Sequence, residues 1–238
     1  MANIYRGGAI IGKSKLEVVS SGLQLYIDPS IVAPNGTTVY DVKDRYNPVS
    51  CGTINNSGGV YSNSFGGIFQ LNGSNQSITI TPAQSFNAGC TIQVMLRRSN
   101  AGGNYTNFST VFGSRSPNKL ICFDSNSGTQ NYHLESDNNG GTFVNPVFTN
   151  NIPDWYLLTF VNNNQSNGLI SLYKNNQSQA YSINGSITSG TLNLRIGEDN
   201  PNAIFFKGDI GAFLFYNRVL SFSEITNNYY NFSKRFSI

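Results

Sequence analysis

The residues best placed for chemistry lie in one short run, residues 132–137. His133, Glu135 and Asp137 alternate along this run, and side chains two apart on a β-strand share one face. An imidazole and two carboxylates that converge in this way can hold a metal ion, and a carboxylate there can act as an acid or base. The alternative is a hydrated polar face near a strand end, which is favoured because no ligands from elsewhere are evident.

Hydrolysis of a glycosidic bond needs a second carboxylate across a cleft from the first. The chain has only four glutamates, of which Glu17 lies near the N-terminus and Glu224 is predicted to cap a helix. Sandwich glucanases carry an E-x-D-x-x-E run, which would begin here at Glu135, but Gly140 stands where its final acid belongs. The sequence therefore predicts a protein that is not an enzyme.

A second group of oxygen ligands lies at Glu198 and Asp199, just before Asn200 and Pro201. These residues could bind calcium in a turn, although an ordinary acidic turn is favoured. His133 is the only histidine, and the chain contains no G-x-S-x-G, G-x-G-x-x-G or G-x-x-x-x-G-K-[ST] motif. Serine-hydrolase chemistry and nucleotide binding therefore lack recognisable support, and no cofactor is expected.

Short β-branched and aromatic runs, broken by Gly, Asn, Ser and Pro, recur from residue 23 to residue 216. Such runs predict β-strands, and no helical pattern or linker separates them. The expected fold is therefore a single all-β domain, a two-sheet antiparallel sandwich. Its three cysteines, Cys51, Cys90 and Cys122, cannot all pair with one another and are interpreted as free thiols of a reducing compartment.

Two of these strands, residues 155–161 and 210–216, are apolar on both faces. In the second, strict alternation predicts that Ile210 and Ala212 share one face and that Phe213 lies on the other. One face of each strand must line the core between the sheets. The other needs an arm, a helix, a loop or a partner protein to cover it, and cover by the chain itself is favoured.

One short C-terminal helix is predicted at residues 221–230. Ser221 and Glu224 fit a capping box, and Leu220 and Ile225 occupy the positions of a hydrophobic staple. The expected organisation is thus an N-terminal arm at residues 1–20, a sandwich with its helix at residues 21–231, and a C-terminal tail at residues 232–238.

Charged residues make up only 11% of the chain, and its net charge is +3. Residues 1–20 and 218–238 each carry three basic residues and one acidic residue, so both ends could dock on an acidic neighbour. No basic run is interleaved with aromatic residues, which argues against nucleic acid, and no apolar stretch has signal-peptide or membrane-spanning length. The docking candidates are Arg6, Lys13, Lys15, Lys234 and Arg235.

Several motifs of the chain occur together in one known family. They are GLQLYIDP at 22–29, VYDV at 39–42, FQLNGSNQSITI at 69–80, TIQVML at 91–96 and YNRVLSFSEI at 216–225. As a set they resemble the concanavalin A/laminin G-like jelly-roll domains of bacterial surface proteins and phage virion proteins. The resemblance implies a jelly-roll β-sandwich. Because the family has no shared catalytic residues, none are carried over.

The last residues, FSKRFSI at 232–238, resemble an F-x-x-x-R-[FY]-G-I ending of phage members, with one residue fewer between Phe232 and Arg235 and with Ser237 in place of Gly. The resemblance implies a non-enzymatic virion protein, a capsid decoration or tail component made in the host cytoplasm. It would dock through its terminal arms on other virion subunits or on copies of itself. The alternative is a glycan-binding adhesin module on a phage or cell surface, since the chain is rich in aromatic and amide side chains.

Overall fold

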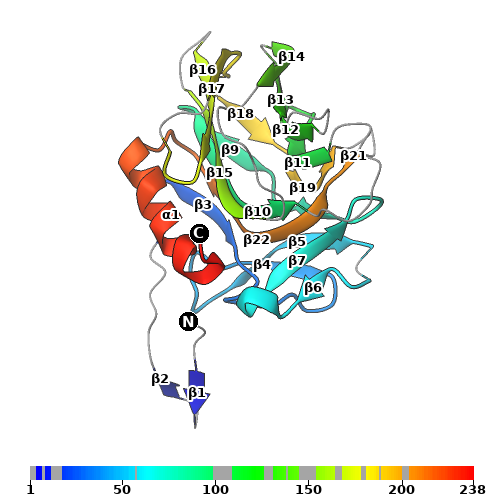
Figure 1. The fold of residues 1–238 in the computed structure, drawn as a ribbon, viewed down its shortest axis with the longest axis vertical. Coiled ribbons are helices and arrows are strands. Elements are labelled where there is room, and N and C mark those ends of the chain that lie inside the picture. Colours follow the sequence, from blue (N-terminus) through cyan, green and yellow to red (C-terminus); the bar gives the residue numbers. More distant parts are fainter. Residues whose placement is uncertain are drawn as a thin grey trace.

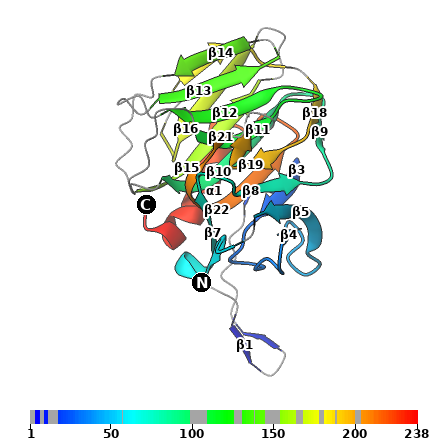
Figure 2. The same ribbon diagram turned by 90° about the vertical axis from the view of Figure 1, so that its right-hand side faces the viewer.

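The computed structural model describes residues 4–6, 9–11, 18–56, 58–98, 109–125, 131–137, 139–144, 154–163, 168–177, 181–187, 189–199 and 204–238. These residues form many β-strands, one α-helix, α1 (Phe222–Phe236), and one 3-10 turn, η1 (Ser64–Gly66). Two large antiparallel sheets face one another, and α1 lies outside one of them (Figures 1 and 2). The prediction of an all-β, two-sheet antiparallel sandwich with one C-terminal helix is confirmed.

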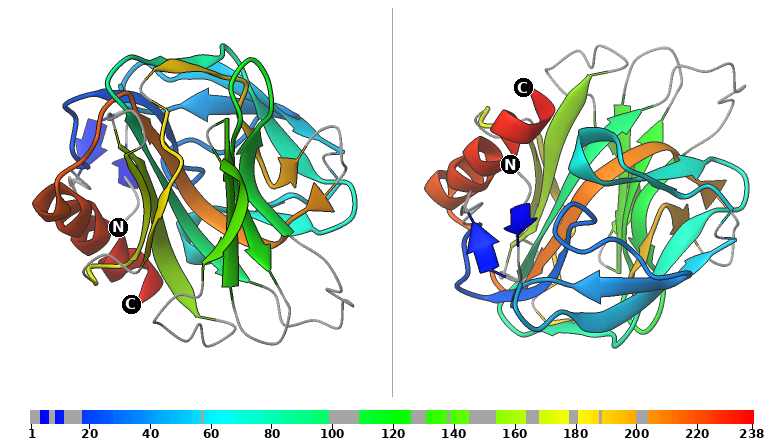
Figure 3. Two further views of the ribbon diagram at one scale, coloured as in Figure 1. Left: turned by 90° about the horizontal axis from the view of Figure 1, so that it is seen from above. Right: turned by 90° about the horizontal axis from the view of Figure 1, so that it is seen from below.

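The first sheet carries α1 on its outer side, as the view from above in Figure 3 shows. Its β3 pairs with β22, outside the main strand order. In spatial order the other strands are β17 (Tyr181–Asn184), β16 (Leu169–Lys174), β15 (Trp155–Asn162), β10 (Cys90–Arg98), β22 (Lys207–Tyr216), β7 (Ile68–Asn72) and β6 (Tyr61–Ser62), and β3 spans Leu23–Ile27.

The second sheet closes the sandwich from the other side. Its strands in spatial order are β14 (Asn139–Val144), β13 (Asn131–Ser136), β12 (Leu120–Ser125), β11 (Ser109–Ser114), β19 (Arg195–Ile196), β8 (Ser77–Ile80), β5 (Val49–Asn55) and β4 (Thr38–Asp41). Three small pairs complete the described strands: β9 (Gln84–Phe86) with β18 (Gly190–Leu192), β20 (Glu198–Asp199) with β21 (Ile204–Phe205), and β1 (Ile4–Arg6) with β2 (Ala9–Ile11).

The main core fills the space between the two sheets. The Phe112 ring of the second sheet packs edge-on against Phe160 and Phe213 of the first, with ring centroids 5.3 and 6.4 Å apart. Cys51, Cys90 and Cys122 are buried and free. Burial of apolar side chains on this scale stabilises the domain.

A second apolar cluster covers the outer side of the first sheet. Trp155, Leu157 and Leu214 pack there against Phe232 and Phe236 of α1. Residues 18–20 of the predicted N-terminal arm also lie here, where Val18 and Val19 pack on the cluster. The prediction that the chain covers its own two-faced strands is therefore confirmed.

The alternation predicted for β22 is wrong at one position. Met95 pairs with Ala212 but Leu96 pairs with Ile210, so Gly211 is the extra residue of a β-bulge. The bulge turns Ile210 into the core between the sheets, on the side of Phe213 and not of Ala212. A side chain at Gly211 would overlap the ring of Phe236, so this glycine lets α1 approach the sheet.

The helix confirms its predicted start and extends beyond its predicted end. Ser221 and Glu224 form both hydrogen bonds of the capping box. The helix then continues through most of the predicted tail, because Phe232 and Phe236 extend its buried face and Ser237 ends it in a left-handed conformation. In the part of the chain that the structure describes, no helix has the length and hydropathy of a membrane span.

Candidate functional site

The first predicted metal site is occupied by ion pairs. His133 Nε2 lies 3.3 Å from Glu135 Oε1, while Glu135 Oε2 lies 3.6 Å from Arg115 Nη1 and 3.8 Å from Lys119 Nζ. Asp137 points elsewhere and accepts from the backbone N–H of Lys119 at 3.0 Å. The strand therefore brings His133 and Glu135 together, but it surrounds the Glu135 carboxylate with positive charge.

The two carboxylates of the second predicted site, Glu198 and Asp199, also pair with arginines. Asp199 is buried and accepts from Arg115 Nε at 2.6 Å and Nη2 at 2.5 Å. Glu198 accepts from Arg195 Nη1 at 2.6 Å and from Ser77 Oγ at 2.7 Å. Among the described residues no three histidine, cysteine or acidic side chains gather as metal ligands.

The predicted docking residues have different surroundings. Lys13 and Lys15 lie outside the described residues, as does the side chain of Arg6. Lys234 is exposed on the last turn of α1. The prediction that Arg235 is a docking residue is wrong, because its guanidinium is turned inward. Nη1 donates to Asp28 Oδ1 at 2.7 Å, and the side chain is 9% exposed. It anchors the end of α1 and is not available to a partner.

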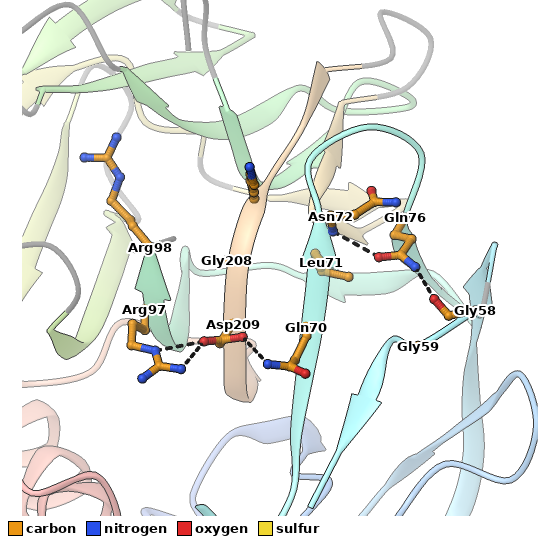
Figure 4. A pocket seen from close by; sticks show the side chains of 11 residues that line it. Gly58, Gly59, Gln70, Leu71, Asn72, Gln76, Arg97, Arg98, Gly208 and Asp209 are labelled. Atoms are coloured by element: carbon orange, nitrogen blue, oxygen red, sulfur yellow. Dashed lines mark hydrogen bonds and ion pairs between the residues drawn. The ribbon is translucent and has the colours of Figure 1, made fainter. Parts of the chain in front are cut away.

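A pocket that the sequence analysis did not identify lies at one end of the first sheet (Figure 4). Its volume is about 640 Å³, which is within the range of small-ligand sites. It lies where β10 ends, β22 begins and β7 leads into the next turn. The lining residues are Gly58, Gly59, Gln70, Leu71, Asn72, Gln76, Arg97, Arg98, Lys207, Gly208 and Asp209.

Three lining side chains form a polar row across neighbouring strands, here called the rim triad: Arg97, Asp209 and Gln70. The backbone register places Arg97 opposite Asp209 and Asp209 opposite Gln70. Asp209 Oδ2 accepts from Arg97 Nε at 2.8 Å and Nη2 at 2.6 Å, and Oδ1 accepts from Gln70 Nε2 at 3.2 Å (Figure 4). The carboxylate is thus fixed from both sides, while Arg97 retains donors and Gln70 an acceptor for a ligand.

A second set of amides shapes the neighbouring wall of the pocket. Gln76 is buried, accepts from the Asn72 N–H at 2.9 Å, and donates to the Gly58 carbonyl at 2.7 Å. Gly208 has a φ of +156°, and a side chain there would overlap the Arg97 carbonyl. Glycine is therefore required where β22 passes β10, next to the rim triad.

The rim triad was missed because its members lie far apart in the sequence. Arg97 is 112 residues from Asp209, and Gln70 is 139 residues from it. The signal that was available is the pair of arginines, Arg97 and Arg98, that ends β10 after a mostly apolar run. That signal marks a position without identifying its partner.

Arg98, the next residue, also lines the pocket, but its guanidinium lies in a different region. Its side chain enters the space between the sheets, where Nε lies 2.5 Å from Asp124 Oδ2. Burial raises the pKa of Asp124 to about 7, although Arg98 opposes this rise. Tyr132 and Tyr156 share a hydrogen bond between their hydroxyl groups in the same region, at 2.5 Å. This cluster is enclosed in protein and is not part of the rim triad.

The sequence of this chain matches a known protein family. Residues 72–226 match the sequence model of a laminin G-type family, described as the concanavalin A-like lectin/glucanases superfamily. No curated protein sequence matches the chain.

Solved structures share the fold at low identity. Domain 4 of AbnA, a GH43 extracellular arabinanase from Geobacillus stearothermophilus solved with arabinotriose, is 20% identical with a TM-score of 0.60; the match covers 87% of this chain and 98% of that one. The ligand-binding domain of botulinum neurotoxin serotype D, solved with N-acetylneuraminic acid, is 17% identical with a TM-score of 0.61, and the match covers 89% of this chain and 51% of the toxin chain. A SAP-like pentraxin from Limulus polyphemus is 12% identical with a TM-score of 0.53, and the match covers 66% of this chain and 78% of the pentraxin chain.

Proposed function

The chain belongs to the concanavalin A-like lectin/glucanases superfamily, and from this premise we propose that it is a non-catalytic carbohydrate-binding domain. The observation that carries the proposal is the rim triad, in which a fixed carboxylate is flanked by a guanidinium and an amide at the edge of a pocket. Domain 4 of the arabinanase, which this chain covers almost completely, has arabinotriose in its structure and gives further support.

The chemistry of the rim triad suits a sugar. Each hydroxyl group of a sugar can donate one hydrogen bond and accept others, so it pairs well with a carboxylate next to a guanidinium. Because Asp209 is already held by Arg97 and Gln70, little side-chain entropy is lost when the ligand binds. The pocket is open and polar, as a binding site for part of a longer glycan would be.

The carboxylates of the sequence-predicted sites support a non-catalytic role. A glycoside hydrolase needs two carboxylates that face one another across a cleft and are free to act on the sugar. Glu135 and Asp199 both contact the guanidinium of Arg115, at 3.6 and 2.5 Å. These ion pairs give the two carboxylates a role in holding the fold together.

The proposal is tested on an array of plant, bacterial and host glycans, with the wild-type chain and two matched variants. Asp209→Asn should lower affinity for the bound glycan at least about tenfold, because it removes the charged acceptor of the rim triad. The control is Glu198→Gln, because the Arg195–Glu198 pair matches the Arg97–Asp209 pair in its 2.6 Å separation. Exposure is also similar: the arginine and acidic side chains are 28% and 12% exposed in the control pair, and 26% and 13% exposed in the rim triad. Equal binding by both variants, or no binding by the wild type, would refute the proposal.

A structural role in a phage particle is the second candidate. It is favoured by the resemblance of residues 232–238 to the ending of phage members of the family. Because α1 takes up most of the C-terminal end and Arg235 is internal, docking would depend mainly on the N-terminal segment, with the exposed Lys234 as the remaining C-terminal candidate. Deleting residues 1–17, ahead of the packed Val18 and Val19, should leave the domain folded and abolish its incorporation into particles. Normal incorporation of the truncated chain would rule out this docking mode.

A further inference from the structure

Phe65 presents an aromatic ring to solvent beside the rim triad. It lies in η1, between β6 and β7, and 40% of it is exposed. One side of its ring faces the outer apolar cluster, with centroids 5.3 Å from Trp155 and 5.8 Å from Phe236. The guanidinium carbon of Arg97 lies 5.3 Å from the Phe65 centroid. The same guanidinium therefore touches both the exposed ring and the Asp209 carboxylate.

The backbone at Phe65 is held in an unfavourable conformation. Its φ of +51° and ψ of 28° lie in the left-handed region, which non-glycine residues rarely occupy. Arg235 maintains this conformation by donating from Nε to the Phe65 carbonyl at 2.7 Å and from Nη2 to the Gly67 carbonyl. Strained residues that are held in place in this way cluster at binding sites.

We propose that Phe65, which lies outside the pocket lining but contacts Arg97 at its edge, is the platform on which the sugar ring stacks. Phe65 and the rim triad together would then select a neutral glycan with a C–H face on one side and hydroxyl groups along an edge. This inference rests on the proposed carbohydrate function of the pocket. The flat ring of Phe65 suits the C–H face, and the rim triad beside it suits the hydroxyl groups. Within the rim triad Arg97 balances the charge of Asp209, so a neutral group is favoured at this part of the site.

The chain contains its own reporter for this contact. Trp155 is its only tryptophan, is buried, and lies edge-on to Phe65. A sugar that stacks on Phe65 should change the emission of Trp155, whereas a sugar bound far from Phe65 should not. Titration with the neutral oligosaccharide that binds best on the array therefore locates the ligand without any enzymatic assay.

Two substitutions at Phe65 test the platform. Phe65→Asn removes the ring with a residue that tolerates the left-handed conformation, and Phe65→Tyr keeps the ring. We expect Phe65→Asn to weaken binding at least about tenfold and Phe65→Tyr to stay within about threefold of the wild type. Tyr46→Ala, at another exposed aromatic residue, is the matched control and should bind normally. Thermal unfolding of each variant establishes that it is folded.

The outcomes separate this inference from the proposed function. If the wild type binds a neutral glycan, Asp209→Asn weakens binding and Phe65→Asn does not, the platform is refuted and the carbohydrate function stands. Preferential binding of an anionic glycan would refute the neutral specificity alone. If the wild type binds no glycan, both proposals are refuted.

Discussion

Arg97 and Arg98 are neighbours in sequence and form ion pairs of opposite kinds. Side chains of successive residues in β10 point to opposite faces, so Arg97 reaches Asp209 on the outer side of the first sheet and Arg98 reaches Asp124 between the sheets. The outer pair is 26% and 13% exposed, and the inner pair is 5% and 2% exposed. The same two types of group therefore form a partly exposed ion pair at one position and a buried ion pair at the next.

This difference assigns the two pairs different roles. A partly exposed ion pair adds little to stability, so its value lies in the charge and hydrogen bonds that it offers a ligand. A buried pair offers nothing to a ligand, yet each of its members depends on the other, because an isolated charge in the core is strongly unfavourable. Substitutions in the outer pair should therefore affect binding, and substitutions in the inner pair should affect folding.

Removing an arginine from each pair should give the largest contrast. Arg98→Ala leaves the buried Asp124 without its cation and should lower the free energy of unfolding by about 3–5 kcal/mol. Arg97→Ala loses a partly exposed ion pair and contacts with Phe65 and Trp155, which should cost about 1–2 kcal/mol. Urea denaturation at neutral pH measures both values. Equal losses would show that the two environments do not differ as described.

The pH dependence of stability should reveal the buried pair next. The folded chain raises the pKa of Asp124 to about 7, chiefly by burial, so the folded state binds a proton more tightly than the unfolded state does. The contribution of this group is complete below about pH 4 and is lost as the pH rises to about 7. Denaturation midpoints measured across this interval should decline in the wild type and less steeply in Asp124→Asn. Parallel curves would contradict the assignment.

A third pair, Arg218–Glu224 at the start of α1, should give the smallest effect and the opposite sign. Hydrogen bonds from Arg218, and then from Ser221, lower the pKa of Glu224 to about 2. Its contribution is therefore present above about pH 4.5 and is lost as the pH falls to about 2. Glu224→Gln retains the capping geometry and removes the charge, so it should cost about 0.5–1 kcal/mol at pH 7 and nothing near pH 2. An undiminished loss at pH 2, measured by denaturation, would exclude the ion pair as the cause.

Much of the fold could be predicted from local patterns. Period-two apolar runs and turn residues identify the strands, and Ser221 with Glu224 marks where α1 begins. Apolar residues on both faces of β15 and β22 indicate that a second layer covers the first sheet. These features depend on neighbouring residues, which the sequence displays directly.

The candidate site could not be predicted in the same way. A bulge at Gly211 shifts Ile210 to the other face, and alternation alone gives no sign of it. Arg235 is basic and close to the terminus, yet the path of α1 brings it to Asp28, 207 residues away. The rim triad likewise depends on strand order, which brings β7, β22 and β10 together only in the folded sheet. Each miss concerns a partner that is distant in sequence.

A crystal structure of the chain with the neutral oligosaccharide that binds best on the array tests the central claim most directly. We expect a sugar in the pocket of Figure 4, with hydroxyl groups within hydrogen-bond distance of Asp209 and either Arg97 or Gln70. A sugar bound at another face, with the rim triad solvated, would contradict it.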